Sequence, residues 1–150
     1  MTSNELKSIE KIASSVFSCL EKELKTFITS YHRRFPIDCC DIASGLLYVI
    51  LQEEGFCNCK LIRGHDPRGQ SHVWVENENF IIDLTSHQFH GFHGPLILIS
   101  KDEYPLNKPP YYSVTETMDL ENWEYFELLV PYFFESFYND YYKKAQNKND

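Results

Sequence analysis

Hydrophobic residues recur every three or four positions along residues 4–31, which is the period of one face of an α-helix. Thr2 and Glu5 fit a capping box, in which the two side chains bind backbone N–H groups at the helix start. Pro36 prevents the helix from running further. The pattern predicts a long amphipathic helix with one apolar face, made of Leu6, Ile9, Ile12, Val16, Leu20, Leu24, Phe27 and Tyr31.

A second helix is predicted over about residues 39–53, where nearly every residue from Ile42 to Leu51 is apolar. Asp38 is placed to cap its start, and Gly55 is placed to close its end. A helix that is apolar on most of its sides is a buried one. We therefore expect this helix to pack inside the domain.

After this helix the apolar period changes to two, the period of a β-strand. Strands are predicted at 57–64, 71–76, 79–85 and 96–100, with a polar turn at 66–69. Residues 101–117, rich in Pro and Tyr, are predicted to form an ordered loop. A last helical region is predicted over about 119–143, followed by a frayed tail at 145–150.

The predicted elements are two N-terminal helices, four strands and a C-terminal helical region. The length of 150 residues suits one domain, with its core over about 35–100 and the aromatic helical region at about 119–143. The 14 Lys and Arg against 22 Asp and Glu leave a net charge of −8. This charge argues against binding to nucleic acids or anionic membranes, which requires clustered basic residues.

The five cysteines, two of them adjacent, make a poor disulfide framework because their number is odd. The opening residues do not resemble a signal peptide, and no apolar run approaches the roughly 20 residues of a membrane span. We therefore expect free thiols and a cytoplasmic location.

A hairpin between residues 71 and 85 brings an imidazole and a carboxylate together. A turn centred between Asn77 and Glu78 would place His72 directly opposite Asp83. In that register the two side chains share one face with Trp74 and Ile81, while Val73, Val75, Phe80 and Ile82 share the other. A carboxylate behind an imidazole fixes its tautomer and supports the imidazolium. An ordinary cross-strand polar pair would look the same in the sequence.

Cys40 lies at the predicted start of the buried helix. There the helix dipole and the N–H groups of the first turn favour a thiolate and can stabilise a developing oxyanion. A buried structural cysteine is the alternative. Cys39 is the rival nucleophile.

Three segments in this order resemble the cysteine enzymes of the transglutaminase-like and papain-like superfamily. The pattern Phe35-Pro36-x-x-Cys39-Cys40-x-x-Ala43-Ser44-x-Leu46-Leu47, closed by Gly55, is similar to the nucleophile helix of that family. Ser71-His72-Val73-Trp74-Val75-Glu76 resembles its His strand, and Ile81-Ile82-Asp83-Leu84-Thr85 resembles its Asp strand. The resemblance covers roughly residues 35–89. It implies an α+β fold with N-terminal helices, in which the nucleophile helix packs on an antiparallel sheet.

The resemblance implies Cys40 as nucleophile, His72 as general base and Asp83 as orienting acid. It prefers Cys40 over Cys39 because Ser44 and Gly55 then match the family spacing. The family acts on amides of protein or peptide substrates by proteolysis, transamidation or deamidation of glutamine, without a cofactor. Its oxyanion helper ahead of the nucleophile has no counterpart here, since Asp38 lies there, and Gln88 is a candidate substitute. Independently of the resemblance, Trp74 shares a face with His72 and is a candidate for shielding the site or binding substrate, with core packing as the alternative.

Two other functions remain open from the sequence. A catalytically inactive relative would act as a binding module, with a protein partner at the aromatic C-terminal region. A metal site is the least favoured alternative, because one residue between two cysteines is too few for a zinc knuckle. Its candidate ligands are Cys57, Cys59, His87, His90 and His93.

Overall fold

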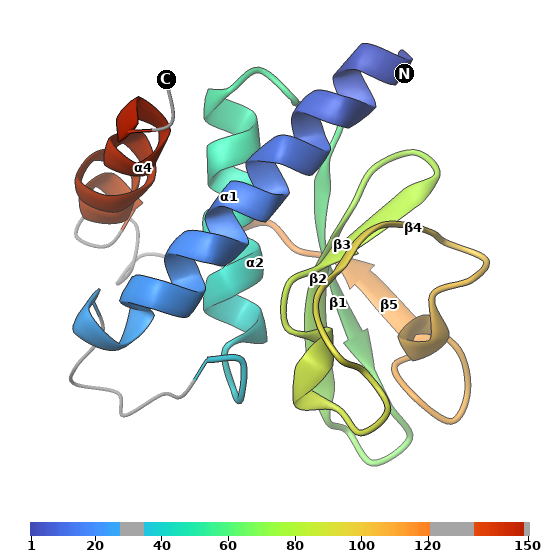
Figure 1. Ribbon diagram of the computed structural model, residues 1–150. Helices are drawn as coiled ribbons and strands as arrows, with labels where there is room; N and C mark the ends of the chain where they lie inside the picture. The colour runs from blue at the N-terminus through green and yellow to red at the C-terminus, as the bar shows by residue number, and fades with distance from the viewer. Residues whose placement is uncertain (28–34, 121–133, 149–150) are drawn as a thin grey trace.

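A computed structural model describes residues 1–27, 35–120 and 134–148 of the chain. The fold is α+β, with helices on one side of a five-stranded antiparallel sheet (Figure 1). The helices are α1 (Ser3–Phe27), α2 (Cys40–Glu53) and α4 (Lys143–Lys148). The strands are β1 (Lys60–His65), β2 (Ser71–Glu76), β3 (Phe80–Asp83), β4 (Leu96–Ser100) and β5 (Val114–Thr117). Short helical turns are η1 (Ser86–Gln88), η2 (Pro105–Asn107) and the π-helical η5 (Phe137–Tyr142).

Helix α1 confirms the predicted capping box. The Thr2 N–H donates to Glu5 Oε2 at 3.0 Å, and the Glu5 N–H donates to Thr2 Oγ1 at 3.1 Å. The predicted apolar stripe is buried from Ile9 to Leu24. The rest of the predicted helix, residues 28–31, lies outside the described residues.

Helix α2 begins at Cys40, but not in the way that the sequence suggested. Asp38 does not cap it: its φ of +57° is left-handed, and the N-cap is Cys39, which makes no side-chain capping bond. The first helical hydrogen bond runs from the Ala43 N–H to the Cys39 carbonyl at 2.9 Å. The end of the helix is as predicted, because Gly55 adopts a φ of +94° just after it.

The strands follow the order β4-β3-β2-β1-β5 in the sheet. β2 and β4 have the predicted bounds, whereas β1 and β3 are shorter than predicted. Strand β5 was missed, since residues 101–117 were expected to be a loop; all four of its residues are exposed, so it has no apolar alternation to detect. β4 contains a bulge opposite Ile81 and Ile82, where Leu98 has a φ of +59°.

The predicted hairpin register is wrong by two residues. Val75 pairs with Ile82 and Glu76 with Ile81, so His72 and Asp83 are not directly opposite each other. The cause is the turn, which the Asn77 N–H closes by donating to the Phe80 carbonyl at 2.9 Å. Because side chains alternate with a period of two, a shift of two residues keeps every residue on its predicted face.

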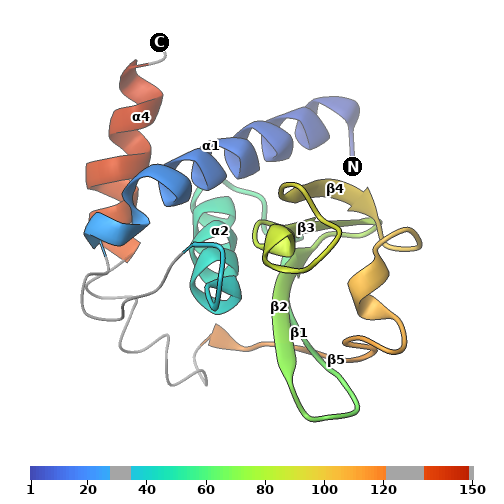
Figure 2. The same cartoon turned by 60° about the horizontal axis from the view of Figure 1, so that its bottom comes forward.

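The central strands of the sheet, β1, β2 and β3, are buried on both faces. One face packs against α1 and α2 through Val73, Val75 and Ile82. On the other face the segment between β4 and β5 crosses the sheet (Figure 2) and packs Tyr104 and Tyr112 against Trp74. This face of the sheet therefore carries a second hydrophobic core.

The C-terminal segment packs beside α1. Phe137 and Tyr142 are buried in the same core as α1 and α2. Helix α4 continues to Lys148, so the frayed tail predicted from residue 145 is wrong over 145–148. Most of the predicted aromatic helical region, 121–133, lies outside the described residues, so the proposed partner surface there remains a prediction. None of the helices within the described ranges is long and apolar enough to span a bilayer.

Gly64 is expected to be intolerant of alanine. It pairs with His72, and an added Cβ would lie 2.6 Å from the Trp74 ring and from Tyr112. Overpacking of this kind costs about 1–3 kcal/mol. We therefore expect Gly64→Ala to lower the free energy of unfolding by about 2 kcal/mol in urea titrations. Gly94→Ala is the matched control, because nothing lies within 4 Å of its added Cβ; equal stability of the two variants would contradict the packing argument.

Candidate active site

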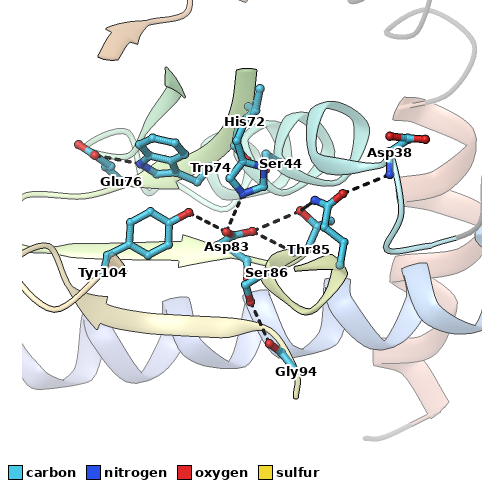
Figure 3. A network of polar contacts seen from close by, with 12 residues as sticks. Asp38, Ser44, His72, Trp74, Glu76, Asp83, Thr85, Ser86, Gly94 and Tyr104 are labelled. Carbon is cyan, nitrogen blue, oxygen red and sulfur yellow. Dashed lines mark hydrogen bonds and ion pairs between the residues drawn. The ribbon is translucent and has the colours of Figure 1, made fainter. Parts of the chain in front are cut away.

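The centre of the site is a buried pair of an imidazole and a carboxylate. His72 Nε2 lies 2.8 Å from Asp83 Oδ2 (Figure 3), and the two side chains are 1% and 0% exposed. They sit diagonally on the same face of β2 and β3. The sequence therefore predicted the pair and its face correctly, although it predicted the wrong cross-strand partners.

Asp83 also accepts hydrogen bonds from two residues that sequence reasoning missed. The Tyr104 hydroxyl donates to Oδ2 at 2.7 Å, while the Thr85 backbone N–H and hydroxyl donate to Oδ1 at 3.0 and 3.3 Å. Both carboxylate oxygens are thus satisfied inside the protein, as a buried charge requires. The contact with Thr85 could have been predicted from the sequence, because an aspartate side chain often accepts the backbone N–H of the residue two positions later.

The charges of this cluster shift its pKa values. Burial lowers the pKa of His72, but the Asp83 carboxylate and hydrogen bonds to Asp83 and Cys40 raise it to about 10. Burial acts to raise the pKa of Asp83, yet the imidazole and the hydrogen bonds from His72, Tyr104 and Thr85 lower it overall. Burial and the nearby carboxylate raise the pKa of Tyr104 well above its ordinary value, so its hydroxyl remains a donor.

Cys40 is the thiol that contacts this pair. Its half-buried side chain lies close enough to His72 to raise the pKa of the imidazole. Because Nε2 faces Asp83, Nδ1 is the ring nitrogen left for the sulfur. One turn later, the Ser44 hydroxyl donates to the Val73 carbonyl at 3.0 Å, which ties α2 to the strand next to His72. The start of the helix and the imidazole are therefore positioned together.

Cys39 lies in a different environment. Its side chain is fully buried in the core between the sheet and the helices, and its thiol donates to the Ile37 carbonyl at 3.2 Å. Of the two adjacent cysteines, Cys40 is the one for which a contact with His72 is found.

Gln88 and Trp74 have defined contacts. The Gln88 carboxamide accepts the Asp38 N–H at 3.3 Å and donates to the Thr85 hydroxyl at 3.2 Å, so it bridges two loops; an oxyanion role for it remains a prediction. Trp74 is fully buried and donates from Nε1 to Glu76 at 3.0 Å. Its ring packs in the second core, with its centre 5.9 Å from that of His72, and a role in shielding the site or binding substrate remains a prediction.

Aromatic rings surround the imidazole on further sides. Phe89 meets it edge-on, with ring centres 4.9 Å apart, and Tyr112 lies 5.4 Å from it. Both come from segments outside the strands that bear the pair. Excluding water in this way strengthens the interaction between the imidazole and the carboxylate.

The residues considered for a metal site are dispersed. Cys57 is exposed and Cys59 is buried, and both precede β1, although the predicted strand at 57–64 included them. His87 packs its ring between Phe17 and Phe35, at 5.6 Å from each. Within residues 1–27, 35–120 and 134–148, no three His, Cys, Asp or Glu side chains are grouped to bind a metal ion.

The arrangement can deprotonate a thiol and return the proton to a leaving group, which are the two proton transfers of covalent amide chemistry. Comparisons of the chain with family models, with curated proteins and with solved structures found no match. The functional argument therefore depends on the geometry of Cys40, His72 and Asp83 and on the resemblance of their motifs.

Proposed function

We propose that the protein is a cysteine enzyme of the transglutaminase-like or papain-like class that acts on amide bonds of peptide or protein substrates. The observation that supports this function best is an imidazole that contacts a thiol on one side and a fully buried carboxylate on the other. The packing of α2 on an antiparallel sheet agrees with the fold expected for this class.

In the proposed reaction the Cys40 sulfur, as thiolate, attacks the carbonyl carbon of a carboxamide or peptide. The C–N bond then breaks, the His72 imidazolium gives its proton to the leaving nitrogen, and a thioester on Cys40 forms. Water or an amine next attacks the thioester, with His72 accepting its proton, and the thiolate is released. Asp83 orients the ring and stabilises its charged form throughout.

Backbone N–H groups at the start of α2 are proposed to stabilise the oxyanion. The N–H groups in the first turn of a helix have no carbonyl acceptor within that helix. They can therefore donate to an oxyanion that forms at a nucleophile on the same turn. Cys40 is the first residue of α2. The backbone N–H of Cys40 itself is therefore a proposed donor to the oxyanion.

A reducing compartment such as the cytoplasm fits this chemistry. All five cysteines are free thiols, including the exposed Cys57. A nucleophilic thiol requires the reduced state.

Competition between cysteines for iodoacetamide tests the proposed function. At pH 6 we expect Cys40 to be alkylated at least about tenfold faster than Cys57, because an adjacent imidazolium favours the reactive thiolate. Cys57 is an internal control, since it is exposed whereas Cys40 is half-buried. The rates are read at each cysteine by peptide mass spectrometry. Faster reaction of Cys57 would exclude an activated Cys40.

Incubation with glutamine-containing peptides and hydroxylamine then tests the acyl-enzyme directly. Hydroxylamine competes with water for a thioester, so a hydroxamate product is expected with the unmodified protein. The product should be absent after Cys40→Ala. A hydroxamate that still forms in Cys40→Ala would show that the thioester is not on Cys40.

A further inference from the structure

Asp38, two residues before Cys40, has an unfavourable backbone conformation. Its φ of +57° lies in the left-handed region, which residues other than glycine seldom adopt. Its backbone N–H donates to Gln88 Oε1 at 3.3 Å (Figure 3). The two residues are 50 positions apart in the chain, so the segment before the nucleophile is bonded to the segment after Asp83.

The other end of the Gln88 carboxamide points toward the carboxylate of the pair. Its Nε2 donates to Thr85 Oγ1 at 3.2 Å, and that hydroxyl lies 3.3 Å from Asp83 Oδ1. The carboxylate accepts only, so the hydroxyl must donate to it and accept from Gln88. The Asp38 N–H donates only, so Oε1 must face it. The donors and acceptors therefore allow a single orientation of the carboxamide.

A neighbouring contact joins the same two segments. The ring of His87 lies 5.6 Å from that of Phe35, and the two meet edge to face. His87 and Gln88, two successive residues of η1, thus contact Phe35 and Asp38 in the segment that leads to Cys40. The Gln88 side chain is bonded at both ends and lies beside this ring contact, so it is suited to keeping the segment before Cys40 in one conformation.

We propose that Gln88 is a positioning residue, which stabilises the positive φ of Asp38 and thereby places Cys40 beside His72. The inference rests on the proposed function, because it assigns Gln88 a part in the reactivity of Cys40. It differs from an oxyanion role, since the contacts of Gln88 are with the protein and not with the reacting atoms.

The experiment compares Gln88→Met with the double variant Gln88→Met/Asp38→Gly. Methionine has a similar length but cannot replace the two hydrogen bonds, so alkylation of Cys40 at pH 6 should slow about five- to tenfold. Hydrogen exchange of the Asp38 amide should become faster in the same variant. Glycine adopts a positive φ without cost, so Asp38→Gly in the Gln88→Met background should restore most of the Cys40 rate. Gln70→Met, at an exposed turn, is the control and should change neither quantity.

The proposal is overturned if Gln88→Met leaves the Cys40 rate unchanged, or if Asp38→Gly fails to restore it. Restoration supports it, because a role limited to general stability would not be repaired by relaxing one φ angle. The two proposals can fail separately. If Cys40 of the unmodified protein reacts no faster than Cys57, the proposed function fails, whereas the exchange rate of the Asp38 amide still reports on the Gln88 bond.

Discussion

Alkylation of Cys40 by iodoacetamide at pH 6 is expected to slow by about a hundredfold when His72 is replaced by alanine. The thiolate is the form that reacts, and His72 supplies the positive charge next to the sulfur. Without the ring, the thiol is left beside the buried Asp83 carboxylate, which disfavours a second negative charge. The rate is measured at Cys40 by peptide mass spectrometry over pH 5–9, and the loss should be largest at the acidic end.

A matched control exists on the surface of the protein. His65 and Glu116 form a second imidazole–carboxylate pair, 3.1 Å apart, but with both side chains exposed. His65→Ala removes the same kind of group without touching the buried pair and should leave the Cys40 rate unchanged. Equal effects of the two substitutions would mean that the reactivity of Cys40 does not depend on His72.

Asp83→Asn is expected to destabilise the protein by about 3 kcal/mol near pH 6, the usual result of removing one partner of a buried ion pair. Asp83 accepts hydrogen bonds from His72, Tyr104 and Thr85 through both of its carboxylate oxygens. Asparagine replaces one of these oxygens with an NH₂ group, which cannot accept a hydrogen bond. Without the Asp83 charge the pKa of His72 falls, because burial lowers it and the largest opposing interaction is gone.

The same pair predicts how stability depends on pH. The pKa of His72 is raised from 6.5 to about 10 on folding, so its contribution is complete below pH 6.5 and is lost as pH rises toward 10. The pKa of Asp83 is lowered from 3.8, so its contribution is present above pH 3.8 and is lost as pH falls through the lowered pKa. The stabilisation by the pair is therefore greatest between about pH 4 and 6.5.

Urea unfolding of the unmodified protein and of Asp83→Asn at pH 5.5, 7 and 9 checks both statements. The difference in unfolding free energy should be largest at pH 5.5 and smaller at pH 9. Glu116→Gln, which removes the carboxylate of the exposed pair, should shift stability by less than about 1 kcal/mol at every pH. A difference between the unmodified protein and Asp83→Asn that grows toward pH 9 would contradict the assigned ionisation of His72.

The hairpin shows what the sequence could predict and what it could not. Alternation places His72, Trp74, Ile81 and Asp83 on one face, and the structure confirms this. The partners were wrong because the turn lies one residue later than the polar break suggests. The Asn77 side chain accepts the Phe80 N–H at 2.9 Å and the Asn79 N–H at 3.2 Å, so the turn includes Phe80. A side-chain hydrogen bond of this kind leaves no trace in the apolar pattern.

Some residues of the candidate site could be predicted from the sequence and others could not. Cys40, His72 and Asp83 could be proposed from motif order and from the helix and strand that bear them. Tyr104 could not, because it reaches Asp83 from a loop beyond β4, and nothing local in its sequence refers to that contact. Asp38 was misassigned as a cap, since aspartate is common at helix starts, while it is also one of the few residues besides glycine that adopt a left-handed conformation. Only its tertiary contacts distinguish a capping aspartate from one in a left-handed conformation.

The bulge in β4 also affects how readily two copies of this chain can pair through the edges of their sheets. β4 is an edge strand of the sheet and its sequence, Leu-Ile-Leu-Ile-Ser, has the composition of segments that recruit further strands. Leu98, with its φ of +59°, interrupts the regular row of backbone N–H and C=O groups in the middle of that strand. The irregularity is thus a barrier to the addition of further strands at this apolar edge of the sheet.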